Sequence, residues 1–212
     1  MTGVLFDLDG TLADTALDLG YVLNILRERH GLPPLPAAVI RPYASHGTPG
    51  LLHIGFGLSP QDAPFAALRA DFLDLYQRHL STHTRLFPGI DALLQELDAR
   101  GLPWGVVTNK PERFTLPLME QLGLMKRAAS IVGGDTCAHA KPHPEPMLHA
   151  CRELNVAPEN CLYLGDAERD VAAARAANMR ALIAAYGYLG ADDEPDTWNA
   201  DGSIDHPAQL LA

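Results

Sequence analysis

Short apolar runs alternate with segments of helical periodicity over much of the chain. The first run, residues 4–8, is apolar apart from one acid, which is the pattern of a strand buried on both faces. The same pattern predicts further strands at residues 104–108, 130–133, 161–165 and 180–185. Helices are predicted at residues 90–100, 111–122, 146–154 and 170–177. Repeated strand–helix units of this kind favour an α/β fold with a doubly wound parallel sheet.

A largely helical stretch, residues 14–82, interrupts this alternation. Apolar residues recur at helical spacing from about residue 15 to 30, and a second helical pattern follows Ser59 and Pro60, which suit a helix start. A glycine-rich segment, residues 45–50, lies between them. We therefore expect an α/β core formed by residues 1–13 and 83–212, with a helical cap of residues 14–82 inserted after the first strand. Residues 190–203 form a polar connection with no predicted element.

The composition excludes several classes of protein. The 212 residues are 47% hydrophobic and 20% charged, so the chain can bury a core and is not disordered. The formal net charge is −10 and lysines and arginines form no run, so nucleic acid is not an expected partner. The three cysteines form no CxxC pair, and no apolar run reaches about 18 residues. We expect a cytoplasmic protein that does not bind or cross a membrane.

Acidic residues follow two of the predicted strands. Asp7 and Asp9 stand two residues apart at the end of the first strand, so their carboxylates point to the same side of an extended chain. Asp166 follows a later strand, and Asp170 lies four positions further on. Ligand sites of open parallel sheets form at the carboxyl ends of strands. The structural alternatives are a turn at Asp9-Gly10 and helix capping by Asp170.

Phosphate-binding groups are found in two other segments. Thr108 and Asn109 end a predicted strand just before a helix opening at Pro111. A hydroxyl, an amide and the free N–H groups of a helix start can bind a phosphate, although these residues also suit helix capping. Lys141 stands among alternating prolines that stiffen its segment. The alternative for a single lysine is a solvated surface charge.

Carboxylates gathered at one place require a cation. Two unit charges about 4 Å apart repel by roughly 4 kcal/mol at an effective dielectric constant of 20. An all-oxygen acidic site with room for water and phosphate favours Mg²⁺ over zinc. Cys137, His139 and His143 offer softer ligands, but their spacing matches no standard zinc pattern.

In this order, the motifs resemble those of the haloacid dehalogenase superfamily of phosphatases. The matching elements are Asp7-x-Asp9-Gly10-Thr11, Thr108-Asn109, Lys141-Pro142 and Gly165-Asp166-x-x-x-Asp170. The resemblance covers nearly the whole chain, and residues 132–146 resemble the phosphoglycolate phosphatase branch in particular. It implies a Rossmann-like α/β core with an inserted cap. It also implies Mg²⁺-dependent hydrolysis of a small phosphomonoester through an aspartyl-phosphate intermediate.

The resemblance further implies a role for each matching residue. Asp7 is implied as the nucleophile and Asp9 as the general acid and base. Mg²⁺ would be bound by Asp7, the backbone carbonyl of Asp9 and Asp166, with Asp170 supporting the site from nearby. Many relatives carry Ser or Thr where this chain has Ala167, so a hydroxyl near the metal is missing here.

The transferring phosphoryl group is implied to be bound by Thr108, the amide of Asn109 and Lys141.

Three other functions share part of this pattern. A haloacid dehalogenase attacks carbon and needs neither an acid at position 9 nor a metal site. A phospho-receiver module carries its aspartate mid-chain without a helical insertion of this size. A non-catalytic binding protein has no need for the complete set of catalytic groups, so we predict a phosphoric monoester hydrolase.

Substrate choice is expected to lie in the cap, which encloses a ligand and excludes water. The candidate specificity residues in the cap are Arg41, Ser45, His46, Thr48 and His53. The alternative for each is that it is an ordinary polar residue of a loop, with no part in substrate choice. Phosphoglycolate is the first expected substrate, and Arg41 is expected to pair with its carboxylate. The alternative is N-acetylmuramic acid 6-phosphate or another sugar phosphate, because residues 104–111, 186–188 and 198–201 also resemble muramate-phosphate phosphatases. We expect a monomer or weak homodimer.

Overall fold

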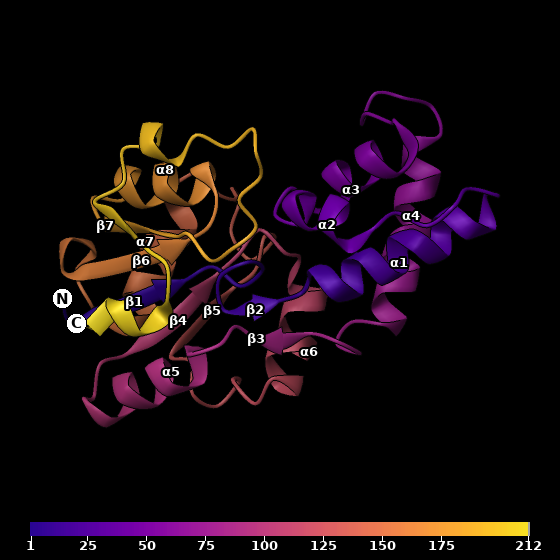
Figure 1. Cartoon of the computed structure of the whole chain (residues 1–212). Helices are drawn as coiled ribbons and strands as arrows, with labels where there is room; N and C mark the ends of the chain where they lie inside the picture. Colours follow the sequence, from indigo (N-terminus) through magenta and orange to yellow (C-terminus); the bar gives the residue numbers. More distant parts are fainter. Residues whose placement is uncertain (212) are drawn as a thin grey trace. The chain divides into compact units, whose positions relative to one another are not determined.

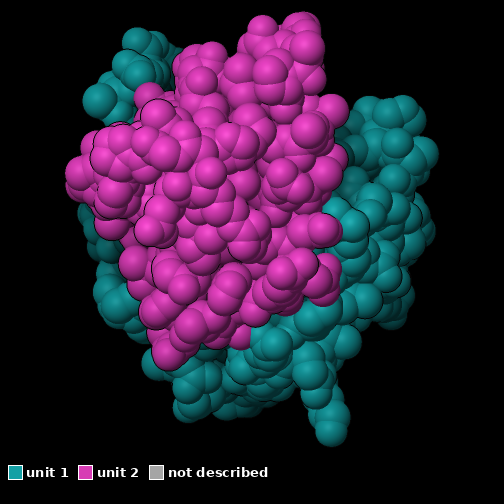
Figure 2. All heavy atoms as spheres, turned by 90° about the vertical axis from the view of Figure 1, so that its right-hand side faces the viewer, with its two compact units in different colours: residues 1–13, 86–212 teal, residues 14–85 magenta. Residues whose placement is uncertain are grey.

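The computed structural model describes residues 1–211 and divides into two compact units, coloured separately in Figure 2. Unit 1 comprises Met1–Ala13 and the chain from Leu86 onward, and unit 2 comprises Asp14–Arg85. The second boundary therefore falls after residue 85 rather than after residue 82 as expected. Two short strands, β2 (Ala13–Asp14) and β3 (Arg85–Leu86), pair with each other at this boundary. That unit 2 acts as a cap stays a prediction.

Unit 1 is built on a parallel sheet that confirms the predicted fold class. Within residues 1–211 its six strands have the order β5-β4-β1-β6-β7-β8 (Figure 1). The chain first adds strands on one side of β1 and then on the other, which creates a topological switch point beside β1. The strands are β1 (Gly3–Phe6), β4 (Trp104–Val107), β5 (Ser130–Val132), β6 (Cys161–Gly165), β7 (Arg180–Ala184) and β8 (Gly202–Ile204).

Helices cover both faces of this sheet, which explains why its central strands are apolar without alternation. On one face, Leu5 and Tyr163 are buried against α7 and α8 in a single cluster. On the other face, the Phe6 and Trp104 rings meet edge to face at 6.3 Å, and Trp104 Nε1 donates to Asp98 Oδ1 of α5 at 2.8 Å. The helices are α5 (Ile90–Ala99), α6 (Glu112–Gln121), α7 (Glu145–Leu154) and α8 (Glu168–Ala176).

The edge strand β8 is a difference from the sequence prediction, which placed only a polar connection at residues 190–203. Of its residues Gly202–Ile204, only Ile204 is buried, so the strand carries no apolar run. A polar contact holds it in place instead: Asp201 donates its N–H to the Ala181 carbonyl and accepts the Ala181 N–H through Oδ2, both at 2.8 Å. A short edge strand fixed in this way has no periodic signature.

Unit 2 is helical, and α1 packs against α3 and α4. Its helices are α1 (Ala16–Arg29), α2 (Ala37–Ile40), α3 (Gly47–Phe56) and α4 (Phe65–Arg78), with a 3-10 turn at Arg41–Tyr43. Most of the glycine-rich segment at residues 45–50 is helical, because α3 begins at Gly47. Leu51 and Leu52 are fully buried, and this tertiary burial offsets the low helix propensity of the glycines.

A buried carboxylate joins the two ends of unit 2. Asp18 in the first turn of α1 is inaccessible to solvent. Its oxygens accept the N–H groups of His83 and Thr84 and the Thr84 hydroxyl at 2.8–3.0 Å, and His83 Nδ1 lies 2.8 Å from Oδ1. These hydrogen bonds hold the pKa of Asp18 below its ordinary value even though burial acts to raise it. The carboxylate therefore fixes the segment that leads into β3.

Candidate active site

The carboxylates of Asp7, Asp166 and Asp170 come together at the carboxyl ends of β1 and β6. These strands are neighbours in register, with Phe6 beside Leu164, so the residues that follow them emerge at the same edge of the sheet. One oxygen of each carboxylate lies within 4.8 Å of the others, and all three residues are buried. The fold thus concentrates negative charge at one interior point.

Lys141 supplies a positive charge at this point. Its Nζ lies 2.6 Å from Asp170 Oδ1 and 3.0 Å from Asp7 Oδ1, and it donates to the Val107 carbonyl and the Tyr163 hydroxyl, each at 2.8 Å. The side chain is completely buried, so the alternative of a solvated surface charge is excluded. A lysine that is fully desolvated needs such partners to stay charged.

The electrostatics of Asp7 reflect this environment. Burial raises its pKa from 3.8 to about 6, and the Lys141 ammonium offsets part of that rise. Asp7 Oδ1 is buried beside the Lys141 ammonium, and no described residue donates a hydrogen bond of good geometry to it. An oxygen of this kind, within reach of Asp166 in an all-carboxylate set, fits a hard divalent cation that prefers oxygen ligands.

Glycines allow the close approach that places Asp166. Gly10 has φ of +84°, and a Cβ there would lie 2.1 Å from Asp166 Oδ2, so the turn after Asp9 admits no side chain. A Cβ on Gly187 would lie 2.5 Å from the Cβ of Asp166. The N–H of Tyr188 donates to Asp166 Oδ2 at 3.0 Å. The aspartate is therefore fixed from both sides.

Asp170 combines the two roles that sequence reasoning treated as alternatives. Its Oδ2 accepts the N–H of Ala167 at 3.0 Å, which caps the start of α8. Its Oδ1 faces Lys141 at 2.6 Å. The N–H of Ala167 thus orients the carboxylate that Lys141 contacts, without a side-chain hydroxyl at position 167.

Asn109 holds the segment that carries Lys141. Its Nδ2 donates to the Lys141 carbonyl at 2.8 Å, and its Oδ1 accepts the Lys141 N–H at 3.0 Å. Thr108 is buried and its Oγ1 accepts the N–H of Lys110 at 3.2 Å. The side-chain amide of Asn109 therefore makes its hydrogen bonds within the protein, where it holds the backbone of Lys141.

Asp9 points to a different partner. Its Oδ1 accepts a hydrogen bond from Lys110 Nζ at 2.8 Å, and the lysine side chain is only 7% exposed. Sequence reasoning assigned no role to Lys110, although it directly follows Asn109 in a predicted phosphate-binding segment. Tyr163 was also missed, and its place in the apolar run of β6 hid its hydroxyl among core residues.

Arg169 adds a further charge that the sequence did not single out. It lies between Glu168 and Asp170 in the first turn of α8 and is partly buried. Burial acts to lower its pKa, but the negative charges of Asp170, Asp7 and Asp166 raise it overall. Its guanidinium therefore stays charged and reduces the net negative charge of the carboxylate group.

The candidate specificity residues lie in unit 2. Arg41 forms an ion pair with Asp14, with Nη1 2.9 and 2.8 Å from the two carboxylate oxygens, and its side chain remains 36% exposed. Ser45 and His46 precede α3, and Thr48 lies in its first turn. His53 is exposed in the last turn of the same helix.

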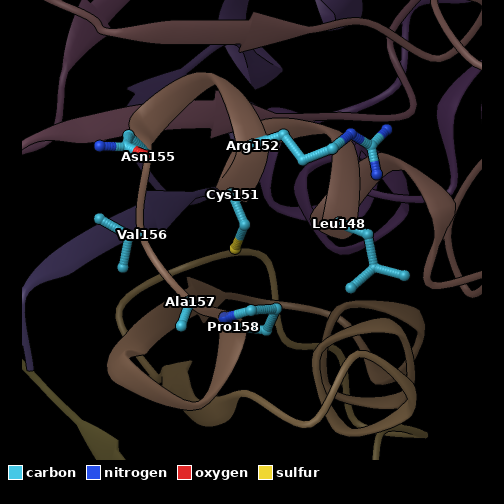
Figure 3. Close-up of a pocket in the computed structure, with 7 residues that line it drawn as sticks. All are labelled: Leu148, Cys151, Arg152, Asn155, Val156, Ala157 and Pro158. Carbon is cyan, nitrogen blue, oxygen red and sulfur yellow. The ribbon is translucent and has the colours of Figure 1, made fainter.

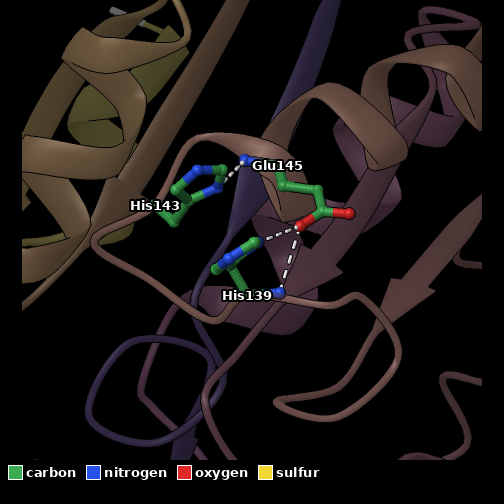
Figure 4. A group of neighbouring side chains, drawn as sticks. All are labelled: His139, His143 and Glu145. Atoms are coloured by element: carbon green, nitrogen blue, oxygen red, sulfur yellow. Dashed lines mark hydrogen bonds and ion pairs between the residues drawn. The ribbon is translucent and has the colours of Figure 1, made fainter.

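A second group of metal-ligand types lies near Lys141 on the surface. His139, His143 and Glu145 gather there (Figure 4). Glu145 Oε2 accepts the His139 N–H at 3.0 Å and lies 2.9 Å from His139 Nδ1, and the two histidine rings stack at 4.3 Å. Cys137 is not part of this group. These contacts tie the segment around Lys141, residues 139–143, to the start of α7.

A pocket of about 440 Å³ lies elsewhere, between the C-terminal half of α7 and the turn that precedes β6 (Figure 3). Cys151, Val156 and Pro158 contribute mostly apolar surface to it. Its residues lead into the amino end of β6, whereas the carboxylates stand beyond the carboxyl end. The pocket contains none of the predicted site residues.

Among residues 1–211, no helix is both long and apolar enough to span a membrane.

The family model of haloacid dehalogenase-like hydrolases matches residues 4–184. The chain belongs to this family. An N-acetylmuramic acid 6-phosphate phosphatase of Pseudomonas putida is 41% identical over 210 residues, 99% of this chain and 94% of that protein. A phosphoglycolate phosphatase of Xanthomonas campestris pv. campestris is 44% identical over 207 residues, 98% and 93% of the two chains.

The fold of this haloacid dehalogenase-like hydrolase is also found in solved structures. A predicted phosphoglycolate phosphatase from Haemophilus somnus superposes with a TM-score of 0.86 at 26% identity, covering 100% of this chain and 96% of that one. The predictions of family, α/β fold class and hydrolase class are confirmed.

Proposed function

We propose that this hydrolase cleaves a small phosphomonoester through an aspartyl-phosphate on Asp7. The observation that carries the proposal is the buried set formed by Asp7, Lys141, Asp166 and Asp170 at the switch point of the sheet. Relatives named as phosphatases cover nearly the whole chain at 41–44% identity, which supports the phosphatase class.

In the proposed reaction, an oxygen of Asp7 forms a bond to phosphorus while the bond from phosphorus to the ester oxygen breaks. Asp9 donates a proton to the departing alkoxide. In the second step Asp9 takes a proton from water, and the water oxygen bonds to phosphorus as the Asp7–phosphate bond breaks. Inorganic phosphate leaves, and both aspartates return to their starting states.

We further propose that Asp7, the backbone carbonyl of Asp9 and Asp166 hold Mg²⁺, with Asp170 supporting the site through Lys141. When bound, the metal supplies charge neutralisation for the carboxylates and the phosphoryl oxygens. Thr108, the backbone amide of Asn109 and Lys141 are proposed to bind the phosphoryl group. Lys141 suits this task because its ammonium is already desolvated and held by fixed partners.

Phosphoglycolate is the first proposed substrate, supported by relatives named for it in Xanthomonas and Chromobacterium. N-acetylmuramic acid 6-phosphate is the second, supported by the Pseudomonas relatives named for that activity. Unit 2 is proposed to act as the cap that selects between such substrates, with Arg41 recognising a carboxylate.

A cytoplasmic location is proposed, because Cys137, Cys151 and Cys161 are free thiols.

The test is phosphate release by the purified protein from both substrates and from p-nitrophenyl phosphate, each with Mg²⁺ and with EDTA. Mg²⁺-dependent release from all three supports the phosphomonoesterase, and the larger kcat/KM identifies the preferred substrate. Release that is unaffected by EDTA would contradict the metal assignment. No release from any phosphomonoester would contradict the function.

A further inference from the structure

Lys110 is a nearly buried cation directed at Asp9 rather than at solvent. Its Nζ donates to Asp9 Oδ1 at 2.8 Å, and the side chains are 7% and 15% exposed, respectively. The two residues are 101 positions apart in the sequence. Removing a lysine from water is costly unless a charged partner compensates for it, so this pair is a specific feature of the site.

The backbone of Lys110 is fixed on several sides. Its carbonyl accepts the N–H of Gly134 at 2.8 Å and the hydroxyl of Thr115 at 2.9 Å, and its N–H donates to Thr108 Oγ1. A Cβ on Gly134 would lie 2.2 Å from the Asn109 carbonyl oxygen, so the loop after β5 packs directly against this turn. Because β1 and β4 are neighbours in the sheet, a lysine held here reaches the end of β1.

We propose that Lys110 is a positioning residue that fixes the Asp9 carboxylate for proton transfer, an inference that rests on the proposed phosphatase reaction. Lys110 holds Oδ1, and Oδ2 is the oxygen that exchanges the proton. Oδ2 gives its proton to the alkoxide as the phosphorus–oxygen bond breaks, and later takes one from water as the water oxygen bonds to phosphorus. The lysine keeps all its protons throughout both steps.

Substrates with different leaving groups distinguish this positioning role from a purely structural one. An alkoxide leaves poorly unless it is protonated, whereas p-nitrophenolate leaves as a stabilised anion without help from an acid. Misplacing Asp9 therefore slows phosphoenzyme formation from an alkyl phosphate far more than from p-nitrophenyl phosphate. A lysine that served the fold alone would affect both substrates equally.

The experiment compares Lys110→Met, which keeps the length without the charge, with Lys110→Arg and with Lys126→Met as the matched control. Lys126 is an exposed lysine of the same unit. Rapid-quench single turnovers measure phosphoenzyme formation from an alkyl phosphomonoester and from p-nitrophenyl phosphate, and Mg²⁺-dependent thermal shifts report the fold and the metal site. Lys110→Gln replaces Lys110→Met if that variant does not fold.

We expect Lys110→Met to slow phosphoenzyme formation from the alkyl substrate by about 100-fold, the lower end of general acid catalysis, with little change for p-nitrophenyl phosphate or in KM. Lys110→Arg should recover much of the rate, and Lys126→Met should match the wild type. Equal losses on both substrates, or a raised KM with an unchanged rate, would overturn the positioning role. If the wild type forms no phosphoenzyme from either substrate, the proposed function fails instead.

Discussion

The ammonium group of Lys141 lies 2.6 Å from Asp170 Oδ1, and neither side chain is exposed to solvent. Two opposite charges removed from water at this distance hold each other in place, because each would otherwise carry an uncompensated desolvation cost. The pair fixes Lys141 beside Asp7, where its charge faces the proposed nucleophile.

Asp170→Asn keeps the size of the side chain and removes the charge facing Lys141. We expect kcat to fall by about 10–100-fold, as for other groups that support a metal site. Steady-state kinetics with p-nitrophenyl phosphate measures this. Glu168→Gln is the matched control, since Glu168 is exposed in the same turn of α8. An Asp170→Asn enzyme with wild-type kcat would rule out the role given to this pair.

Asp7→Asn is expected to abolish activity and yet stabilise the protein in EDTA at neutral pH. The pKa of Asp7 is raised from 3.8 to about 6, so its ionised form is disfavoured in the folded state. That penalty, at most about 3 kcal/mol, is present above the folded pKa and vanishes below the unfolded one. Thermal unfolding should show a higher Tm for the variant at neutral pH, and the two Tm values should converge as the pH falls below about 4. A lower Tm at neutral pH would contradict the burial argument.

Asp166→Asn is expected to remove the stabilisation that Mg²⁺ gives to the wild-type protein. A bound ion stabilises the folded state by about 2.7 kcal/mol when its concentration is a hundred times Kd. Thermal shifts over a Mg²⁺ titration measure this without reference to catalysis. Asp192→Asn changes an exposed aspartate of unit 1, and this variant should keep the rise in Tm that Mg²⁺ causes in the wild type. An unchanged response in Asp166→Asn would place the ion elsewhere.

Arg41→Ala is expected to lower kcat/KM for phosphoglycolate by about tenfold or more, because a charge-assisted contact is worth about 1.5–3 kcal/mol. Hydrolysis of p-nitrophenyl phosphate, which has no carboxylate, should change little. Asp14→Asn provides the comparison, because it removes the partner of Arg41 and keeps the arginine. If both variants lose activity on both substrates, Arg41 supports the fold of unit 2 and does not select the substrate.

Asp18→Asn is expected to destabilise the protein by about 1–3 kcal/mol, since an amide cannot accept all the hydrogen bonds from His83 and Thr84. The pKa of Asp18 is lowered in the folded state. Its stabilising contribution is therefore complete above the unfolded pKa and is lost as the pH falls through the folded pKa. Denaturant unfolding should show a difference in unfolding free energy between the two proteins that is constant near neutral pH and becomes smaller in acid. A difference that does not depend on pH would mean that the charge of Asp18 does not contribute to stability.

Much of the core follows from local sequence pattern. The strand ending at Asp7 and the strand ending at Asp166 are apolar runs, and such runs next to helical periodicity specify a parallel sheet. Polar residues that follow parallel strands must emerge at one edge, so the meeting of Asp7 with Asp166 could be predicted before any coordinates. Pattern reasoning missed β8, since a three-residue edge strand with one buried side chain, Ile204, has no period.

Local pattern therefore specifies the central strands, the parallel sheet and the acids at its edge, since each of these depends on neighbours within a few positions. The hydrogen-bond and ion-pair partners of the polar side chains depend instead on how the chain folds. Asp9 meets Lys110 across 101 positions, Asn109 meets Lys141 across 32, and Asp18 meets Thr84 across 66. Contacts of this kind depend on the strand order and on the path of the loops. A buried charged group pairs with the oppositely charged group that the packing brings within reach. That is why Lys110 could not be assigned a partner until the chain was folded.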